Sequence, residues 1–170
     1  MKTSFLDSSQ TITADFIIQL QDFLSRAMCA TYAGEGKPVA PYRSEFIELE
    51  FQENDWHYRD SYAGYAQSWG QEVIWYKQKP LWTQIYGGGM KDLKNVTKAF
   101  CEETFTFLKQ ALSQKHTHFQ PRGPILFQQE NWLYKCEWQG DITQFSGHEE
   151  IYYQSNLIFI HDFRGCFFVE

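Results

Sequence analysis

The feature of this chain that most constrains its fold is a pattern of aromatic and glycine residues that occurs twice. The sequence FQENDWHYRDSYAG at Phe51–Gly64 aligns with FQQENWLYKCEWQG at Phe127–Gly140 with one common offset. One inserted residue later, Gly70–Gly88 aligns with Gly147–Gly165. The paired residues include Trp56 with Trp132, Tyr58 with Tyr134, Tyr62 with Trp138, Gly64 with Gly140, Glu72 with Glu149 and Trp82 with Phe159. Self-similarity of this kind indicates a repeated structural unit. The alternative is that any two amphipathic antiparallel meanders share an aromatic alternation, but the matched glycines and the matched glutamate favour a duplication.

Two segments have the periodicity of amphipathic helices. Ala14–Ala33 places apolar residues at three- and four-residue steps, with Thr13 as a candidate N-cap and Gly34 directly after the last periodic residue. Asn95–Gln114 repeats this pattern, with Asn95 itself as the candidate cap. We therefore expect one helix at the start of each repeat.

Between and after the helices the periodicity changes to two, which is typical of strands. Four strands are expected between Glu45 and Tyr86, ended by the glycines Gly87–Gly89. Four more are expected at Ile125–Gln128, Trp132–Trp138, Glu149–Tyr153 and Leu157–Phe163. Their connections are too short for parallel crossovers. The sequence predicts an α+β fold of one domain, residues 1–170, made of two α-β-β-β-β repeats at residues 14–88 and 95–165. The repeats should be related by a pseudo-twofold axis.

Composition narrows the class of protein. Aromatic residues make up 18% of the chain, which is enough to bury a core, and the formal net charge is −6. An acidic chain without a cluster of Lys and Arg is not expected to contact nucleic acid directly. The chain has no apolar run long enough to cross a bilayer, and Met1–Gln10 lacks the apolar run of a secretory signal. We expect no membrane association and a cytoplasmic location.

The surplus of Trp and Tyr is the clearest indication of a binding site. These residues exceed what one small sheet face can hide, and ligand pockets favour boundaries between packed units. A simple packed core is the alternative, and it explains at least half of them. We expect a cleft between the repeats, lined by Tyr58, Arg59, Tyr62, Glu72, Trp75, Trp82, Trp132 and Glu149.

The charged residues of this set have two interpretations. Arg59 and Glu72 form a cross-strand pair that could bind a polar ligand, or an ordinary sheet salt bridge. Glu72 and Glu149 are equivalent in the two repeats, and could approach each other across the axis and shift each other's pKa. The alternative is two glutamates that face solvent, as charged residues usually do.

Other catalytic and cofactor motifs find no support. His116 and His118 have metal-ligand spacing but no third ligand nearby, so we expect no metal. Gly87–Gly89 is not followed by the residues of a phosphate loop and does not open a helix, so it is interpreted as a turn. No cofactor is expected.

Several motifs resemble an uncharacterised bacterial family. They are TYAG (31–34), WHYRDSYAGY (56–65), GQEVIWYKQKPLW (70–82), YGG (86–88), RGP (122–124) and FSGHEEIYY (145–153). The family is a domain of unknown function, found alone or behind an Xre-type helix-turn-helix in transcriptional regulators. The resemblance implies no catalytic or ligand residues. The residues before the first expected helix are too few for a helix-turn-helix, so we expect the accessory domain alone.

Two functions from different classes follow. The first is a non-catalytic domain that senses a small ligand or binds a protein partner, linked to transcription through a separate DNA-binding protein. The alternative is a small-molecule enzyme that uses Arg59, Glu72 and Glu149. Buried carboxylates with raised pKa in an open pocket would favour the enzyme, and a dry aromatic core with exposed glutamates would disfavour it. A homodimer through free sheet edges is a further option.

Overall fold

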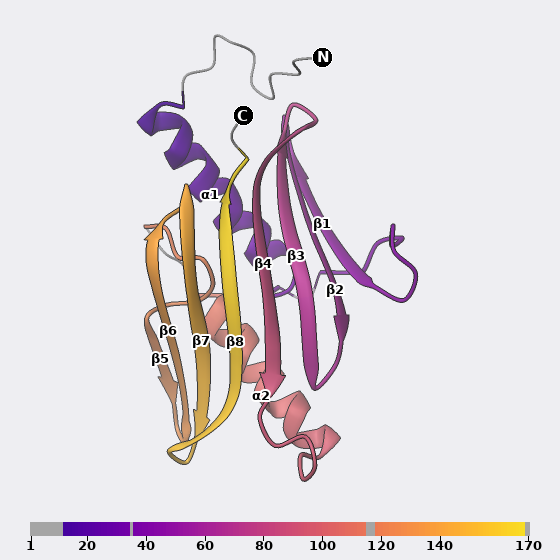
Figure 1. Ribbon diagram of the computed structural model, residues 1–170, viewed down its shortest axis with the longest axis vertical. Helices are drawn as coiled ribbons and strands as arrows, with labels where there is room; N and C mark the ends of the chain where they lie inside the picture. The colour runs from indigo at the N-terminus through magenta and orange to yellow at the C-terminus, as the bar shows by residue number, and fades with distance from the viewer. Residues whose placement is uncertain (1–11, 35, 115–117, 169–170) are drawn as a thin grey trace.

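The computed structural model describes residues 12–34, 36–114 and 118–168 of the chain. Both helices lie on one face of a single eight-stranded antiparallel sheet (Figure 1). The elements are α1 (Ala14–Ala30), β1 (Ile47–Glu53), β2 (Trp56–Gly64), β3 (Gln67–Tyr76), β4 (Lys79–Met90), α2 (Lys98–Leu112), β5 (Leu126–Gln129), β6 (Trp132–Asp141), β7 (Gln144–Tyr153) and β8 (Asn156–Phe167). The α+β class is confirmed. No helix in the described ranges is long and apolar enough to cross a membrane.

The strand order is mirrored about the centre of the sheet. It runs β1-β2-β3-β4-β8-β7-β6-β5, so each run of four strands begins at an edge and ends in the middle. There β4 pairs antiparallel with β8, from Trp82 opposite Phe167 to Met90 opposite Phe159. The element order α-β-β-β-β therefore occurs twice along the chain, and the two sheet halves join edge to edge (Figure 1).

The helices begin with the same local geometry. Thr13 precedes α1 and Thr97 precedes α2, and each hydroxyl accepts a hydrogen bond from the backbone N–H three residues later, at 3.2 Å in both cases. Asn95 was expected as the second cap, and this is wrong: its amide binds the Asp92 carboxylate instead. The α1 helix ends at Ala30, earlier than expected, because Thr31 leaves the helical conformation.

Aromatic residues of the helices pack against the inner face of the sheet, which is the face that the helices cover. Phe16 of α1 stacks on Trp56 of β2, with ring centroids 5.4 Å apart, and Phe100 of α2 stacks on Trp132 of β6 at 5.7 Å. Each Trp also contacts a Tyr of the neighbouring strand at 4.6 Å. Both halves of the core thus use the same contacts in the same order.

The glycines Gly87–Gly89 do not form a turn, and the expectation that they end the sheet is wrong. They lie inside β4, which continues to Met90. Gly88 pairs with His161 of β8 at φ +137°, and a Cβ there would lie 2.2 Å from the Ile160 carbonyl oxygen. Glycine in a strand here allows a close approach of two backbones. The aromatic alternation stops at these glycines, although the hydrogen-bonded ladder does not.

Candidate functional site

A pocket of about 750 Å³ lies between the inner face of the sheet and the helices. Both halves of the chain contribute to it: β2, β3 and β4 from the first, α2 and β8 from the second. Its aromatic lining residues are Tyr32, Tyr58, Tyr62, Tyr65, Tyr86, Phe105 and Phe159. Its deep polar residues are Asp60, Glu72, Arg122 and His161, all of them buried. An aromatic cavity with a few convergent polar groups has the composition of a ligand site.

The strand register brings the polar side chains together. Asp60 of β2 lies opposite Glu72 of β3, which lies opposite Gln84 of β4. In the second half, Glu149 of β7 lies opposite His161 of β8. Residues directly opposite each other on paired strands point to the same face. All five side chains therefore face the helices.

One arginine joins the two glutamates that the sequence alignment of the two halves pairs. Arg122, from the segment between α2 and β5, donates from Nη1 to Glu72 Oε1 at 3.0 Å and from Nε to Glu149 Oε1 at 3.1 Å. Its guanidinium lies 4.7 Å from the centroid of the Tyr86 ring. Glu72 and Glu149 are 2% and 0% exposed, so the alternative of two solvent-facing glutamates is wrong. We call Asp60, Glu72, Tyr86, Arg122, Glu149 and His161 the polar cluster.

Glu149 is held as a carboxylate. Burial opposes its charge, but Arg122 and hydrogen bonds from His161 and Tyr134 outweigh the burial and lower its pKa to about 2. The Tyr134 hydroxyl donates to Glu149 Oε2 at 2.7 Å, and His161 Nδ1 lies 3.2 Å from Oε1. All the acceptor atoms of this carboxylate are engaged within the protein.

Glu72 differs from its counterpart. Burial raises its pKa to about 8, and Arg122 and the Tyr58 hydroxyl, which both favour the charged form, offset only part of that effect. Its Oε1 contacts Arg122 and, at 3.4 Å, the Gln84 amide, but its Oε2 has no hydrogen-bond partner among the described residues. His161 Nε2 also has none in the part of the chain that the structure describes. Both side chains line the pocket. Their two unpartnered atoms are therefore available to hydrogen-bond a molecule bound in the pocket.

Asp60 is a second acid with a raised pKa. Burial raises it to about 6, although Tyr86 and Arg122 favour the charged form. The Tyr86 hydroxyl donates to Asp60 Oδ1 at 2.9 Å. The pocket thus holds two carboxyl groups that titrate much closer to neutral pH than exposed ones do.

The residues predicted for the cleft do not all meet there. Tyr58, Tyr62 and Glu72 line the pocket, and Glu149 lies beneath Arg122. Trp82 is fully buried and donates from its indole N–H to the Ile142 carbonyl at 3.0 Å. Trp132 packs under α2, and Trp75 stacks on His57 at 5.0 Å on the outer face. The packed-core explanation holds for Trp82 and Trp132, whereas Trp75 belongs neither to the core nor to the pocket.

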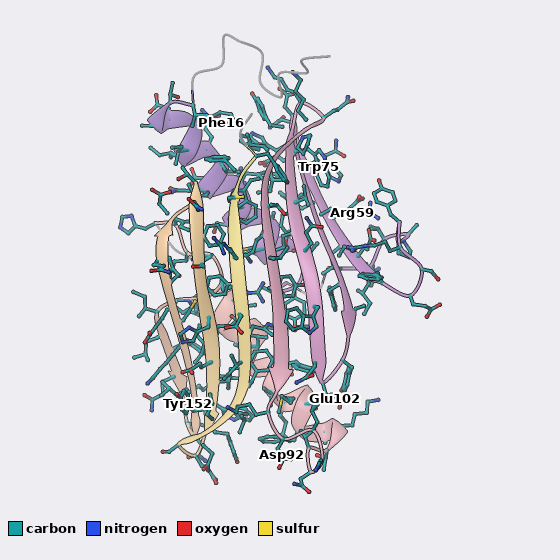
Figure 2. The ribbon with its side chains drawn as sticks, viewed as in Figure 1. Phe16, Arg59, Trp75, Asp92, Glu102 and Tyr152 are labelled. Atoms are coloured by element: carbon teal, nitrogen blue, oxygen red, sulfur yellow. The ribbon has the colours of Figure 1, made fainter. Side chains whose placement is uncertain are left out.

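Arg59 lies on the outer face, away from the helices, so its expected pairing with Glu72 is wrong. The register places Val73 opposite Arg59. Arg59 pairs instead with Glu48 and Glu50 of β1 and donates to the Ala40 carbonyl at 2.8 Å. Figure 2 shows it beside the segment that leads into β1. Neighbouring residues on a strand alternate between faces, and Asp60, not Arg59, points to Glu72.

Four residues of the polar cluster were not predicted as site residues. The inward direction of Asp60 could have been predicted, because Asp60 follows Trp56 and Tyr58 at two-residue steps on the same face of the strand. The direction of His161 could also have been predicted, since the sequence alignment of the two halves pairs it with Gln84, which lies on the same face. Arg122 lies in an irregular segment where no periodicity indicates direction. No group of three potential metal ligands occurs within residues 12–34, 36–114 and 118–168. His116 lies outside the described residues.

The fold and the pocket define a two-helix, single-sheet domain with a charged interior. Residues 60–168 match a family known as a domain of unknown function (DUF5680). The match covers more than half of the chain, and the chain belongs to this family. The matched range contains the whole polar cluster but not α1. Comparison with curated proteins gave no match, and comparison with solved structures gave none either.

Proposed function

We propose that this domain binds a small polar molecule in the pocket between its sheet and its helices. The observation that carries the proposal is a pair of buried atoms, Glu72 Oε2 and His161 Nε2, which have no partner among the described residues and belong to side chains that line a cavity of about 750 Å³. Leaving a buried polar atom without a partner costs roughly 1–3 kcal/mol, which a bound ligand would offset. The volume falls in the range of pockets that enclose small molecules.

The proposal extends to sensing. Binding without chemistry would make the domain a sensor, and the sequence resemblance supports a role in bacterial transcription through a separate DNA-binding protein in the cytoplasm. A duplicated ancestral module is part of this proposal. Its support is the matched N-caps at Thr13 and Thr97 and the matched stacking of Phe16 on Trp56 and Phe100 on Trp132. A homodimer or another protein partner is also proposed, through the sheet edges at β1 and β5.

A thermal-shift screen against a metabolite library tests ligand binding. A molecule that binds the folded state raises the melting temperature, because it stabilises that state by RT ln(1 + [L]/Kd). Thr106 of α2 lines the pocket and is exposed, so Thr106→Trp should fill the pocket and abolish the shift. Glu103→Trp, on an exposed position of the same helix outside the pocket, is the matched control and should keep it. A library without hits, or hits that stabilise Thr106→Trp as much as wild type, would contradict the proposal.

A second candidate function, acid–base catalysis, is favoured by the two perturbed carboxyls. Near neutral pH, Glu72 has a pKa of about 8 and can donate a proton, whereas Asp60, with a pKa of about 6, can accept one. Arg59 has no part in this chemistry, because it lies on the other face. Incubation of each hit with the protein, followed by mass spectrometry, separates the functions. Turnover that Glu72→Gln abolishes while binding persists would establish the enzyme.

A further inference from the structure

We propose that the pocket recognises a small organic cation, whose charged nitrogen binds between Glu72 and Asp60. This inference rests on the proposed ligand binding and names the chemical class of the ligand. Three features carry it: the balance of charge in the polar cluster, the unpartnered buried atom of Glu72 among the described residues, and the aromatic walls.

The charge balance favours a cation over an anion. Three carboxyl groups of the polar cluster, those of Asp60, Glu72 and Glu149, surround the single arginine, Arg122. The Nε and Nη1 groups of Arg122 already donate hydrogen bonds to the two glutamates, and its Nη2 lies 3.1 Å from Glu149 Oε1. An anionic ligand would have to break these contacts and leave buried carboxylates without their partner, which is strongly unfavourable.

The residues that carry the free atoms line the cavity. Glu72 is 2% exposed, and its buried Oε2 is unpartnered among the described residues. Asp60 lies directly opposite Glu72 on the neighbouring strand and lines the same cavity. An ammonium or guanidinium group placed between the two would donate charge-assisted hydrogen bonds to their carboxylates, and such bonds are stronger than neutral ones.

The walls suit a cation as well. Tyrosine faces attract cations within about 6 Å of the ring centroid, and the pocket has five tyrosines among its lining residues. The chain itself uses one of them in this way: the ammonium of Lys109, at the pocket wall, lies 5.4 Å from the centroid of the Tyr32 ring. An organic cation with an apolar body would pack against the aromatic side chains and place its charge beside Asp60 and Glu72.

Binding should release a proton, because a cation favours the charged form of Glu72. The groups that face Glu72 are Tyr58 and Asp60 of β2, Tyr86 of β4, Arg122 of the segment after α2, Glu149 of β7 and His161 of β8, with Glu102 and Lys109 of α2 farther out on the pocket wall. Burial dominates over all of them and raises the pKa of Glu72 to about 8. The affinity for a cation should therefore rise with pH up to that value, by at most about tenfold per pH unit for one released proton.

A series of three probes with one skeleton tests the inference: phenethylamine, phenethyl alcohol and 3-phenylpropionate. Calorimetry at pH 6.5 and 7.5, in two buffers of different ionisation enthalpy, measures affinity and proton release together. The amine should bind at least tenfold more tightly than the alcohol or the carboxylate, with release of up to one proton and tighter binding at the higher pH. Glu72→Gln should lose at least tenfold in amine affinity and lose the pH dependence. Glu103→Gln, which removes the same charge from an exposed position, should lose neither.

The inference is overturned if the alcohol or the carboxylate binds as tightly as the amine, if the amine fails to bind at millimolar concentration, or if Glu72→Gln keeps full amine affinity. Should Glu72→Gln not fold, Asp60→Asn and the proton count of the wild type decide in its place. A library hit that is neutral or anionic and is blocked by Thr106→Trp would overturn the cation class while leaving the pocket function intact.

Discussion

Two glutamates that the sequence alignment of the two halves pairs with each other differ in protonation state at neutral pH. Glu149 has a pKa of about 2 because Arg122, His161 and Tyr134 all favour its charge, whereas Glu72 has a pKa of about 8 because burial prevails. Sequence alignment paired these residues and raised the question of coupled carboxyls. It could not show Arg122, which has no counterpart in the pattern and binds both glutamates, nor that only Glu149 is hydrogen-bonded by His161 and Tyr134.

Substitution of the two glutamates should have unequal effects on stability at pH 7. Glu149→Gln removes a buried carboxylate and leaves Arg122 without its main partner, so the free energy of unfolding should fall by about 3–5 kcal/mol. Glu72→Gln replaces a mostly neutral carboxyl by a neutral amide and should change it by less than about 1.5 kcal/mol. Urea unfolding followed by Trp fluorescence measures both. Equal losses would show that the two acids share one charge state.

The raised pKa of Glu72 predicts a pH dependence of stability with a definite sign. Between its ordinary value of 4.5 and about 8, the unfolded chain has lost the proton that the folded chain retains. The free energy of unfolding should therefore decrease as the pH rises through this interval, by at most about 1.4 kcal/mol per pH unit for one proton. Asp60 adds to the decrease only up to about pH 6.

Urea titrations at pH 6, 7 and 8 check this dependence. Glu72→Gln should flatten the curve between pH 6 and 8, and exposed Glu103→Gln should leave it unchanged. Glu149 acts in the opposite direction, since its stabilising contribution is lost only in acid, as the pH falls toward about 2. A wild-type protein whose stability rises from pH 6 to 8 would be incompatible with a proton held on Glu72.

At the scale of the elements, alternation of aromatic residues predicted the strands correctly. The end of that alternation did not mark the end of a strand. Trp56 and Trp132 mark strands that form as expected, because large rings on one side of a strand bury most area when they face a helix. The predictions for the glycines at 87–89 and for Asn95 as a cap were wrong for one reason. Both relied on the preference of a single residue type for turns or helix starts, and contacts with other residues determined the conformation instead. β8 supplies hydrogen bonds that extend β4 through the glycines, and Thr97 caps α2 closer to its apolar residues.

The close pairing of β4 with β8 makes Gly88 sensitive to any side chain. Gly88→Ala should lower the free energy of unfolding by at least about 1–3 kcal/mol, because the added Cβ meets the Ile160 carbonyl at 2.2 Å in a conformation that alanine disfavours. Ile85→Thr, on the same strand but 56% exposed, is a control that should cost little. Thermal unfolding by circular dichroism compares them, and a Gly88→Ala protein as stable as wild type would show that the strands can separate freely.

For the whole molecule, one continuous sheet means that neither half has a boundary at which it can unfold alone. The β4–β8 ladder is as regular as the pairing within each half. Arg122, carried by the second half, also pairs with Glu72 of the first. We expect a single cooperative transition, in which Trp fluorescence and far-ultraviolet circular dichroism coincide during urea unfolding. Two separated transitions would instead show that the halves behave as independent domains.

The segment that carries Arg122 also makes the two halves unequal in what they can accommodate. Tyr134 aligns with the pocket residue Tyr58, and its hydroxyl accepts a hydrogen bond from the Gly123 N–H. The backbone near Arg122 therefore covers Tyr134, whereas Tyr58 lines the pocket. The pocket between sheet and helices is therefore not repeated in the second half among the described residues, and titrations with a ligand of this pocket should saturate at one molecule per protein rather than two.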